Sequence, residues 1–155
     1  MAKGDFSINV VNLERFNAQL IQLGMAAKPI LKDALKAGGK IIQAAAQSHV
    51  KDGPNKKDHK PGTLRKSIKV RMSSRGGNVR AFVGTGSKDN LYSGKTFYGG
   101  FVEFGHKLGR RKLGNARRDV PAHPFMSLAV KEKRDQAGAV IIETIRAGLA
   151  REGVT

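Results

Sequence analysis

The sequence predicts an α+β fold, in which a small antiparallel sheet is packed by a long helix and a C-terminal helix and long basic loops join the elements. Apolar and polar residues alternate in residues 6–10 and on both sides of a glycine-containing turn at residues 73–77, which is the pattern of half-buried strands. Two longer segments, from Pro29 and from Phe125, repeat apolar residues at helical spacing. The segments expected to be flexible loops lie near residues 51–62, 84–96 and 106–120.

The amino-terminal part is expected to form one strand and one short helix. Phe6, Ile8 and Val10 would share the buried face of the strand. Asn12 suits the start of the helix, because its side chain can accept a hydrogen bond from a free backbone amide. The apolar residues at helical spacing, and the glycine that ends the helix, are Leu13, Phe16, Leu20, Leu23 and Gly24.

A second, longer helix is predicted from Pro29, which fits a first turn because its missing amide would have had no partner there. Its apolar stripe comprises Ile30, Leu31, Ala34, Leu35, Ile41, Ile42 and Ala45. A lysine row on another face comprises Lys28, Lys32, Lys36 and Lys40. These lysines repel one another by a few tenths of a kcal/mol per pair, so the row is either a solvated face or a surface that faces something negative.

Two glycines, Gly38 and Gly39, lie inside this helix and each costs about 1 kcal/mol relative to alanine. Together with Ala44, Ala45 and Ala46 they would let another backbone approach closely. That backbone could belong to this chain or to a neighbouring subunit.

A β-hairpin is predicted around residues 73–77. Its apolar face would comprise Ile68, Val70 and Met72 on the first strand and Val79, Ala81 and Val83 on the second. With residues 6–10 the hairpin would make a small sheet against which the long helix can lie.

Five of the chain's nine aromatic residues fall between Phe97 and Met126. We call residues 97–105 the aromatic anchor, because a helical turn there would place Phe97, Phe101 and Phe104 on one face. Gly105 would end the turn in a left-handed cap. Residues 106–119, which we call the basic loop, would protrude from the anchor as an arm.

The chain is expected to return from the basic loop in an extended form, because residues before Pro121 and Pro124 avoid helical torsions. The last helix is predicted from Phe125 to Arg151. Its polar middle, residues 131–136, would make it bend or leave the core, and Gly153 would end it.

A chain of 155 residues fits a single domain spanning residues 1–155. It has no cysteine, which excludes disulfides and thiolate chemistry, and no apolar run long enough for a membrane helix, so a soluble protein made in the cytosol is expected. The net charge is +17, and residues 51–118 hold 18 basic and 4 acidic residues. This basic middle suggests a nucleic acid, an acidic protein surface or a solvated face.

No catalytic, cofactor or metal site is predicted. Residues 89–96 match the end of a phosphate-binding loop, but Asp89 stands where a glycine is needed and would repel phosphate. The four histidines, which lack the spacing of a helical metal site, are His49, His59, His106 and His123. Glu103 and His106 could form an acid–base pair, but no nucleophile accompanies them. Glu103 could instead pair with a local Arg or Lys, or be exposed.

The order of motifs YGGFVEFG, a variable loop and then PAHPFM, preceded by PGTLRKSIKV, resembles the small neck or tail-completion proteins of long-tailed bacteriophages. The resemblance covers much of residues 61–130. It implies a virion structural protein at the head-to-tail junction or upper tail, acting in a ring around the DNA channel. The basic loop is long and very basic, so what it touches does not follow from the resemblance.

In that role, the residues expected at an interface or as its structural anchor are Tyr98, Phe101, Glu103, Phe104, Pro121, Pro124 and Phe125. The residues expected to contact a partner or passing DNA are Arg110, Arg111, Lys112, Arg117 and Arg118. The anchor aromatics could equally be core residues of one subunit. Other neck and tail proteins, copies of this chain and channel DNA are the expected partners, with no membrane and no small-molecule substrate.

The sequence is also compatible with two other functions. The basic middle could belong to a free nucleic-acid-binding protein, which tight, steeply salt-dependent binding to duplex DNA would indicate. The chain could also be a small enzyme that uses Glu103 and His106 as acid and base. Within the preferred class, the sequence does not separate tail completion from tail termination or a head-side connector, and it gives no ring number.

Overall fold

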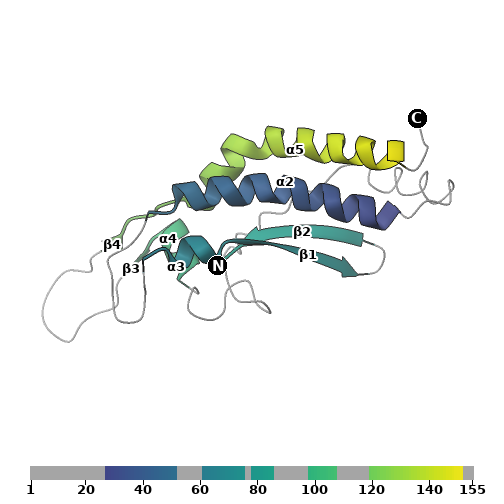
Figure 1. Cartoon of the computed structure of the whole chain (residues 1–155). Coiled ribbons are helices and arrows are strands. Elements are labelled where there is room, and N and C mark those ends of the chain that lie inside the picture. The colour runs from purple at the N-terminus through teal and green to yellow at the C-terminus, as the bar shows by residue number, and fades with distance from the viewer. Residues whose placement is uncertain (1–26, 52–60, 76–77, 86–97, 108–118, 152–155) are drawn as a thin grey trace, which may run out of the picture. The chain divides into compact units, whose positions relative to one another are not determined.

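The computed structural model describes residues 27–51, 61–75, 78–85, 98–107 and 119–151, and its elements confirm the predicted α+β class (Figure 1). The helices are α2 (Ala27–His49), α3 (Thr63–Ser67), α4 (Gly99–Phe104) and α5 (Phe125–Arg151). The strands are β1 (Lys69–Arg75), β2 (Asn78–Gly84), β3 (His106–Lys107) and β4 (Asp119–Val120). The strand predicted at residues 6–10 and the helix after it lie outside the described residues.

The chain groups into two compact units, which share the two long helices. Unit 1 comprises residues 1–42, 70–83 and 133–155, and unit 2 comprises residues 43–69 and 84–132. The single domain expected for residues 1–155 stays a prediction.

In the described part of unit 1, the β1–β2 hairpin packs against α2 and α5 (Figure 1). Its buried cluster contains Leu31, Ala34, Leu35, Val79 and Ile141, with Met72, Ala81 and Ile145 packed against it. The α2 members belong to the stripe that the helical period predicted. The hairpin members lie on the face that the alternation predicted, so both patterns are confirmed here.

Gly38 and Gly39 are sites of close approach within unit 1, as their small size predicted. A Cβ on Gly38 would lie 2.6 Å from the side chain of Ile141 and 3.1 Å from the carbonyl oxygen of Ala137. A Cβ on Gly39 would lie 2.8 Å from Val70. The neighbours are α5 and β1 of this chain, so these glycines bring α2 close to both.

Replacing Gly38 with valine is expected to lower the free energy of unfolding by about 1–3 kcal/mol, because the added methyl groups would force α5 away from α2. Gly138→Ala is the matched control: nothing lies within 4 Å of a Cβ there, so it should raise stability by up to ~1 kcal/mol through helix propensity alone. Urea unfolding of both variants gives the comparison. Equal stability of the two would contradict the close packing of α2 on α5.

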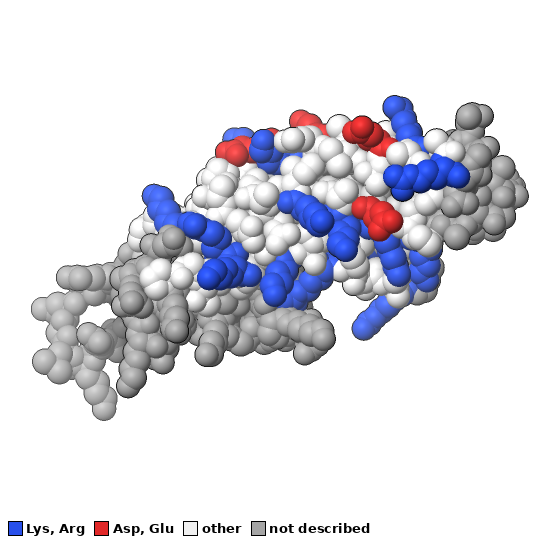
Figure 2. Space-filling view, in the orientation of Figure 1, with Lys and Arg blue, Asp and Glu red and all other residues white. Residues whose placement is uncertain are grey.

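The lysine row of α2 is solvent-facing. Lys28, Lys32, Lys36 and Lys40 are all exposed. Figure 2 shows Lys and Arg side chains over α2 and the hairpin, whereas Asp and Glu lie mainly along α5. In the described part of unit 1, α2 and the hairpin are therefore almost entirely basic, whereas α5 carries charges of both signs.

In unit 2, side chains of the last two turns of α2 hold the chain before β1. The side-chain amides of Gln43 and Gln47 both donate to the carbonyl oxygen of Ile68, at 2.8 and 3.2 Å. Ile68 itself is fully buried. Arg65 of α3 donates to the carbonyl oxygen of Val50 at 2.9 Å. Helix α3, which follows the left-handed Gly62, was not predicted, because five residues are too few to show a helical period.

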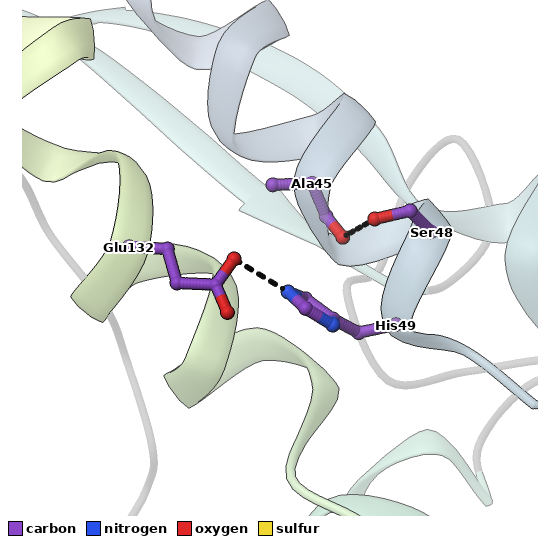
Figure 3. Close-up of polar contacts among 4 residues, drawn as sticks. All are labelled: Ala45, Ser48, His49 and Glu132. Carbon is purple, nitrogen blue, oxygen red and sulfur yellow. Dashed lines mark hydrogen bonds and ion pairs between the residues drawn. The ribbon is translucent and has the colours of Figure 1, made fainter.

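Helix α5 has the bounds predicted for it, and most of its polar middle, residues 131–136, is exposed. Near its start, Glu132 pairs with His49 of α2, with 3.0 Å between the carboxylate and Nε2 (Figure 3). Beside them, Ser48 donates its hydroxyl to the carbonyl oxygen of Ala45 at 2.7 Å. A contact this exposed contributes at most about 1 kcal/mol, whether or not the imidazole is charged. Gly153 lies outside the described residues.

The described part of the chain contains no helix that is both long and apolar enough to cross a membrane.

Candidate functional site

The candidate site lies in unit 2 and is built from α4, the β3–β4 ladder, residues 121–124 and the first turn of α5. It corresponds to the described part of the aromatic anchor together with both ends of the basic loop. Its members come from two segments about twenty residues apart in the sequence, so long-range contacts decide its geometry.

Glu103 joins the two segments. It is buried, with 5% of its surface exposed. Its carboxylate accepts hydrogen bonds from the backbone amides of Met126 and Ser127, both at 2.9 Å, and from the hydroxyl of Ser127. These amides belong to the first turn of α5, where they have no partner within the helix and where the helix dipole favours a negative charge. Glu103 is therefore an N-terminal cap supplied by a distant helix.

This role differs from the pairing with a local lysine or arginine and from the solvent-exposed position that the sequence suggested for Glu103. Burial excludes a solvent-exposed glutamate. Within the described residues its partners are amides and a hydroxyl rather than a lysine or arginine. Ser127 was not predicted as a site residue, because the serine that signals a helix start precedes the first turn and Ser127 is the third residue of α5.

Gly105 lets α4 end directly against the returning chain. Its φ of 69° and ψ of 172° lie in a region that only glycine adopts readily, and differ from the left-handed helical cap predicted for it. A Cβ would lie 2.6 Å from the carbonyl oxygen of Val120 and 2.9 Å from the amide nitrogen of Ala122. Both contacts are with backbone, so they cannot be relieved by a side-chain rotation.

The basic loop begins and ends at a short antiparallel ladder. His106 pairs with Val120 and Lys107 pairs with Asp119. The amide of His123 also donates to the carbonyl oxygen of Val102 at 2.8 Å. Two-residue strands have no detectable period, so the ladder was not predicted. The five basic residues expected to make contacts, Arg110, Arg111, Lys112, Arg117 and Arg118, lie outside the described residues.

Two phenylalanines of α4 are exposed. Phe101 and Phe104 keep 47% and 60% of their surface accessible, and their spacing of three residues places them on one side of the helix. Pro121 and Pro124, in the segment that is hydrogen-bonded to α4, are exposed as well. Phe125, which is 3% exposed, is therefore a core residue. Phe101 and Phe104 are not.

The remaining anchor residues secure the start of α4. Tyr98 is partly buried, which raises the pKa of its phenol because burial disfavours the charged form. Its carbonyl oxygen accepts a hydrogen bond from the amide of Val102 at 3.0 Å. Gly99 is buried against Thr85, whose hydroxyl oxygen would lie 2.6 Å from an added Cβ. Thr85 was not singled out in the sequence.

Several side chains of this site pack against one another or bond to α5. The ring of His106 packs at a tilt against that of Phe101, with 5.1 Å between ring centroids and an interplanar angle of 48°. Glu103 directs its carboxylate at α5, so the two residues of the hypothetical acid–base pair have separate structural roles. Among the described residues there is no group of three or more histidines and acids that could hold a metal ion. The arrangement can present an apolar surface on a fixed support.

A family model described as "HK97-gp10_like: Bacteriophage HK97-gp10, putative tail-component" matches residues 14–105, which is more than half of the chain. The match includes α2, the hairpin and α4, and it ends at Gly105, before the basic loop. Searches of curated proteins and of solved structures found no match.

Proposed function

Because the chain belongs to the HK97 gp10-like family of bacteriophage tail components, we propose that it joins or completes the tail at the head-to-tail interface as a subunit of a ring. A tail component has a structural role. Its position at the head-to-tail interface and its place in a ring are proposals.

The observation that carries the proposal is the exposed pair Phe101 and Phe104. Two large aromatic side chains at roughly half exposure on one side of a six-residue helix mark a contact surface. We call the surface formed by Phe101, Phe104, Pro121 and Pro124 the docking surface. Aromatic residues are enriched among those that dominate binding energy at protein interfaces.

The support of this surface is fixed before binding. Glu103, on the opposite side of α4 from solvent, is hydrogen-bonded to α5, and the amide of His123 is bonded to α4. A surface that is already ordered loses less conformational entropy on association than a mobile one. Glu103 therefore favours docking because it holds α4 in place, although Glu103 itself touches no partner.

A ring follows if the docking surface of one subunit contacts a different surface on the next, since repeated contacts of that kind close into a cycle when the rotation permits. The basic loop would then extend from the β3–β4 ladder towards another neck or tail protein, or towards DNA in the channel. In this proposal the chain is found in the virion, and in the host cytoplasm during assembly.

The double substitution Phe101→Ala/Phe104→Ala is expected to abolish assembly and leave the fold intact. Because both rings are exposed, the free energy of unfolding should change by no more than about 0.5 kcal/mol. Loss of two interface aromatics at ~2 kcal/mol each would weaken association roughly a thousandfold. The measurement is complementation of a phage lacking this chain, with electron microscopy of the particles.

Ile142→Ala is the control, because Ile142 is also exposed, at 53%, but lies on α5 in unit 1. It should complement fully. A normal titre from the double Phe variant would rule out the docking surface, whereas unjoined heads and tails would support the proposed position.

A further inference from the structure

The strongest feature outside the docking surface is the charge of α2 and the hairpin in unit 1. Helix α2 carries four exposed lysines and a single acidic residue, Asp33. Arg71, Arg75 and Arg80 lie at the hairpin positions that alternate with those packed on the helices, and neither strand contains an acid. We call these seven residues, Lys28, Lys32, Lys36, Lys40, Arg71, Arg75 and Arg80, the basic face.

The basic face is not neutralised by the described chain. No salt bridge joins any of these seven side chains to an acidic residue within the described ranges. Among the described residues of unit 1, the acids other than Asp33 are Asp135 and Glu143, and both lie on α5. Figure 2 shows the Asp and Glu side chains along α5 apart from the lysines and arginines of α2 and the hairpin. Like charges at four-residue spacing repel one another, so a polyanion at this surface would remove a repulsion as well as add an attraction.

We propose that the basic face binds the phosphate backbone of duplex DNA without regard to sequence. The lysine steps along α2 are about 6 Å and the row spans about 18 Å. Over that length a duplex presents roughly ten phosphates, at one charge per ~1.7 Å of axis. Each lysine therefore has phosphates within reach of its flexible stem, so no single register is required.

The chemistry of the face favours DNA over an acidic protein. Protein interfaces have an apolar centre, but the exposed large apolar residues of the described chain lie on α4 and α5 and none lies on α2 or the hairpin. Interfaces with DNA are instead polar and strongly positive. Lysine supplies a mobile point charge without the fixed geometry that reads bases, which suits contact with phosphates of any sequence.

This inference concerns unit 1, whereas the docking surface lies in unit 2, so either can fail without the other. The experiment measures binding of the full chain to a fluorescent duplex of about 20 base pairs between about 50 and 200 mM salt. The test variant is Lys28→Gln/Lys32→Gln/Lys36→Gln/Lys40→Gln. The control variant is Lys131→Gln/Lys133→Gln/Arg134→Gln/Arg146→Gln, which removes the same charge from α5.

Loss of four phosphate contacts should make the slope of log affinity against log salt shallower by about three to four, while the control changes it by less than about one. Both variants keep the basic loop, so its contribution cancels. Circular dichroism checks that each variant is folded.

Three results would overturn the inference: an unchanged slope in the α2 variant, equal losses in the two variants, or wild-type binding to poly-glutamate as tight as to DNA at the same salt. The second would show that net charge alone governs binding. The third would assign the face to an acidic protein.

Discussion

Replacing Glu103 with alanine is expected to lower the free energy of unfolding by about 3 kcal/mol, which corresponds to roughly 6–12 °C in melting temperature for a chain of this size. The carboxylate accepts three hydrogen bonds from the first turn of α5 at a buried position. Its removal leaves the amides of Met126 and Ser127 without their acceptor and removes a negative charge from the positive end of a helix dipole.

Two further variants isolate this effect. Glu103→Gln keeps one acceptor oxygen but loses the charge and turns a donor towards an amide, so an intermediate loss of about 1–2 kcal/mol is expected. Glu132→Gln removes a carboxylate that is exposed and paired only with His49 among the described residues, and should cost under ~1 kcal/mol. Thermal unfolding followed by circular dichroism gives all three values. If the Glu103→Ala and Glu132→Gln variants had the same melting temperature, Glu103 could not be an important cap of α5.

The Glu103 variants also bear on assembly. Glu103 does not belong to the docking surface, yet it fixes α4, which carries Phe101 and Phe104. A folded Glu103→Gln variant should therefore assemble less efficiently than the wild type at temperatures where its fold is intact.

Replacing Gly105 with alanine is the second large effect we expect, a loss of about 3 kcal/mol or more. The backbone of Gly105 has a φ of 69° and a ψ of 172°, a region that costs a residue with a Cβ about 1–3 kcal/mol. In addition, the new Cβ would lie 2.6 Å from the carbonyl oxygen of Val120. Relief would require the β3–β4 ladder to separate from the end of α4.

Gly100→Ala is the matched control, since Gly100 lies in α4 and a Cβ there meets nothing within 4 Å. It should be neutral or stabilise the chain by up to ~1 kcal/mol. Urea unfolding compares the two variants. A Gly105→Ala protein as stable as the Gly100→Ala protein would mean that α4 and the returning chain are not held together at this point.

The long elements could be predicted because each repeats its pattern many times. Helix α5 shows apolar residues from Met126 to Leu149, and its start at Phe125 follows two prolines that exclude earlier helical turns. The hairpin alternates on both sides of its turn. By contrast, α3, β3 and β4 contain five, two and two residues, which is too short for any period to appear.

The site was predicted in part. The segment between Phe97 and Met126 was identified from its aromatic residues, glycines and prolines. The sequence did not predict which of these residues are buried. Phe101 and Phe125 are the same residue type in neighbouring motifs, yet one ring is exposed and the other is in the core. The exposure of each ring depends on which residues pack beside it. The hydrophobicity of the residue carries no information about those neighbours.

By itself the sequence determined the α+β class, the two long helices, the hairpin and membership of a phage tail family, because repeating patterns and ordered motifs are properties of the chain read in one direction. The tertiary structure alone decided that Glu103 caps a helix that begins 22 residues later, that Gly105 must lack a side chain, and that Phe101 and Phe104 face outward. Each of these depends on two distant segments meeting within a few ångströms. A linear pattern does not specify that distance.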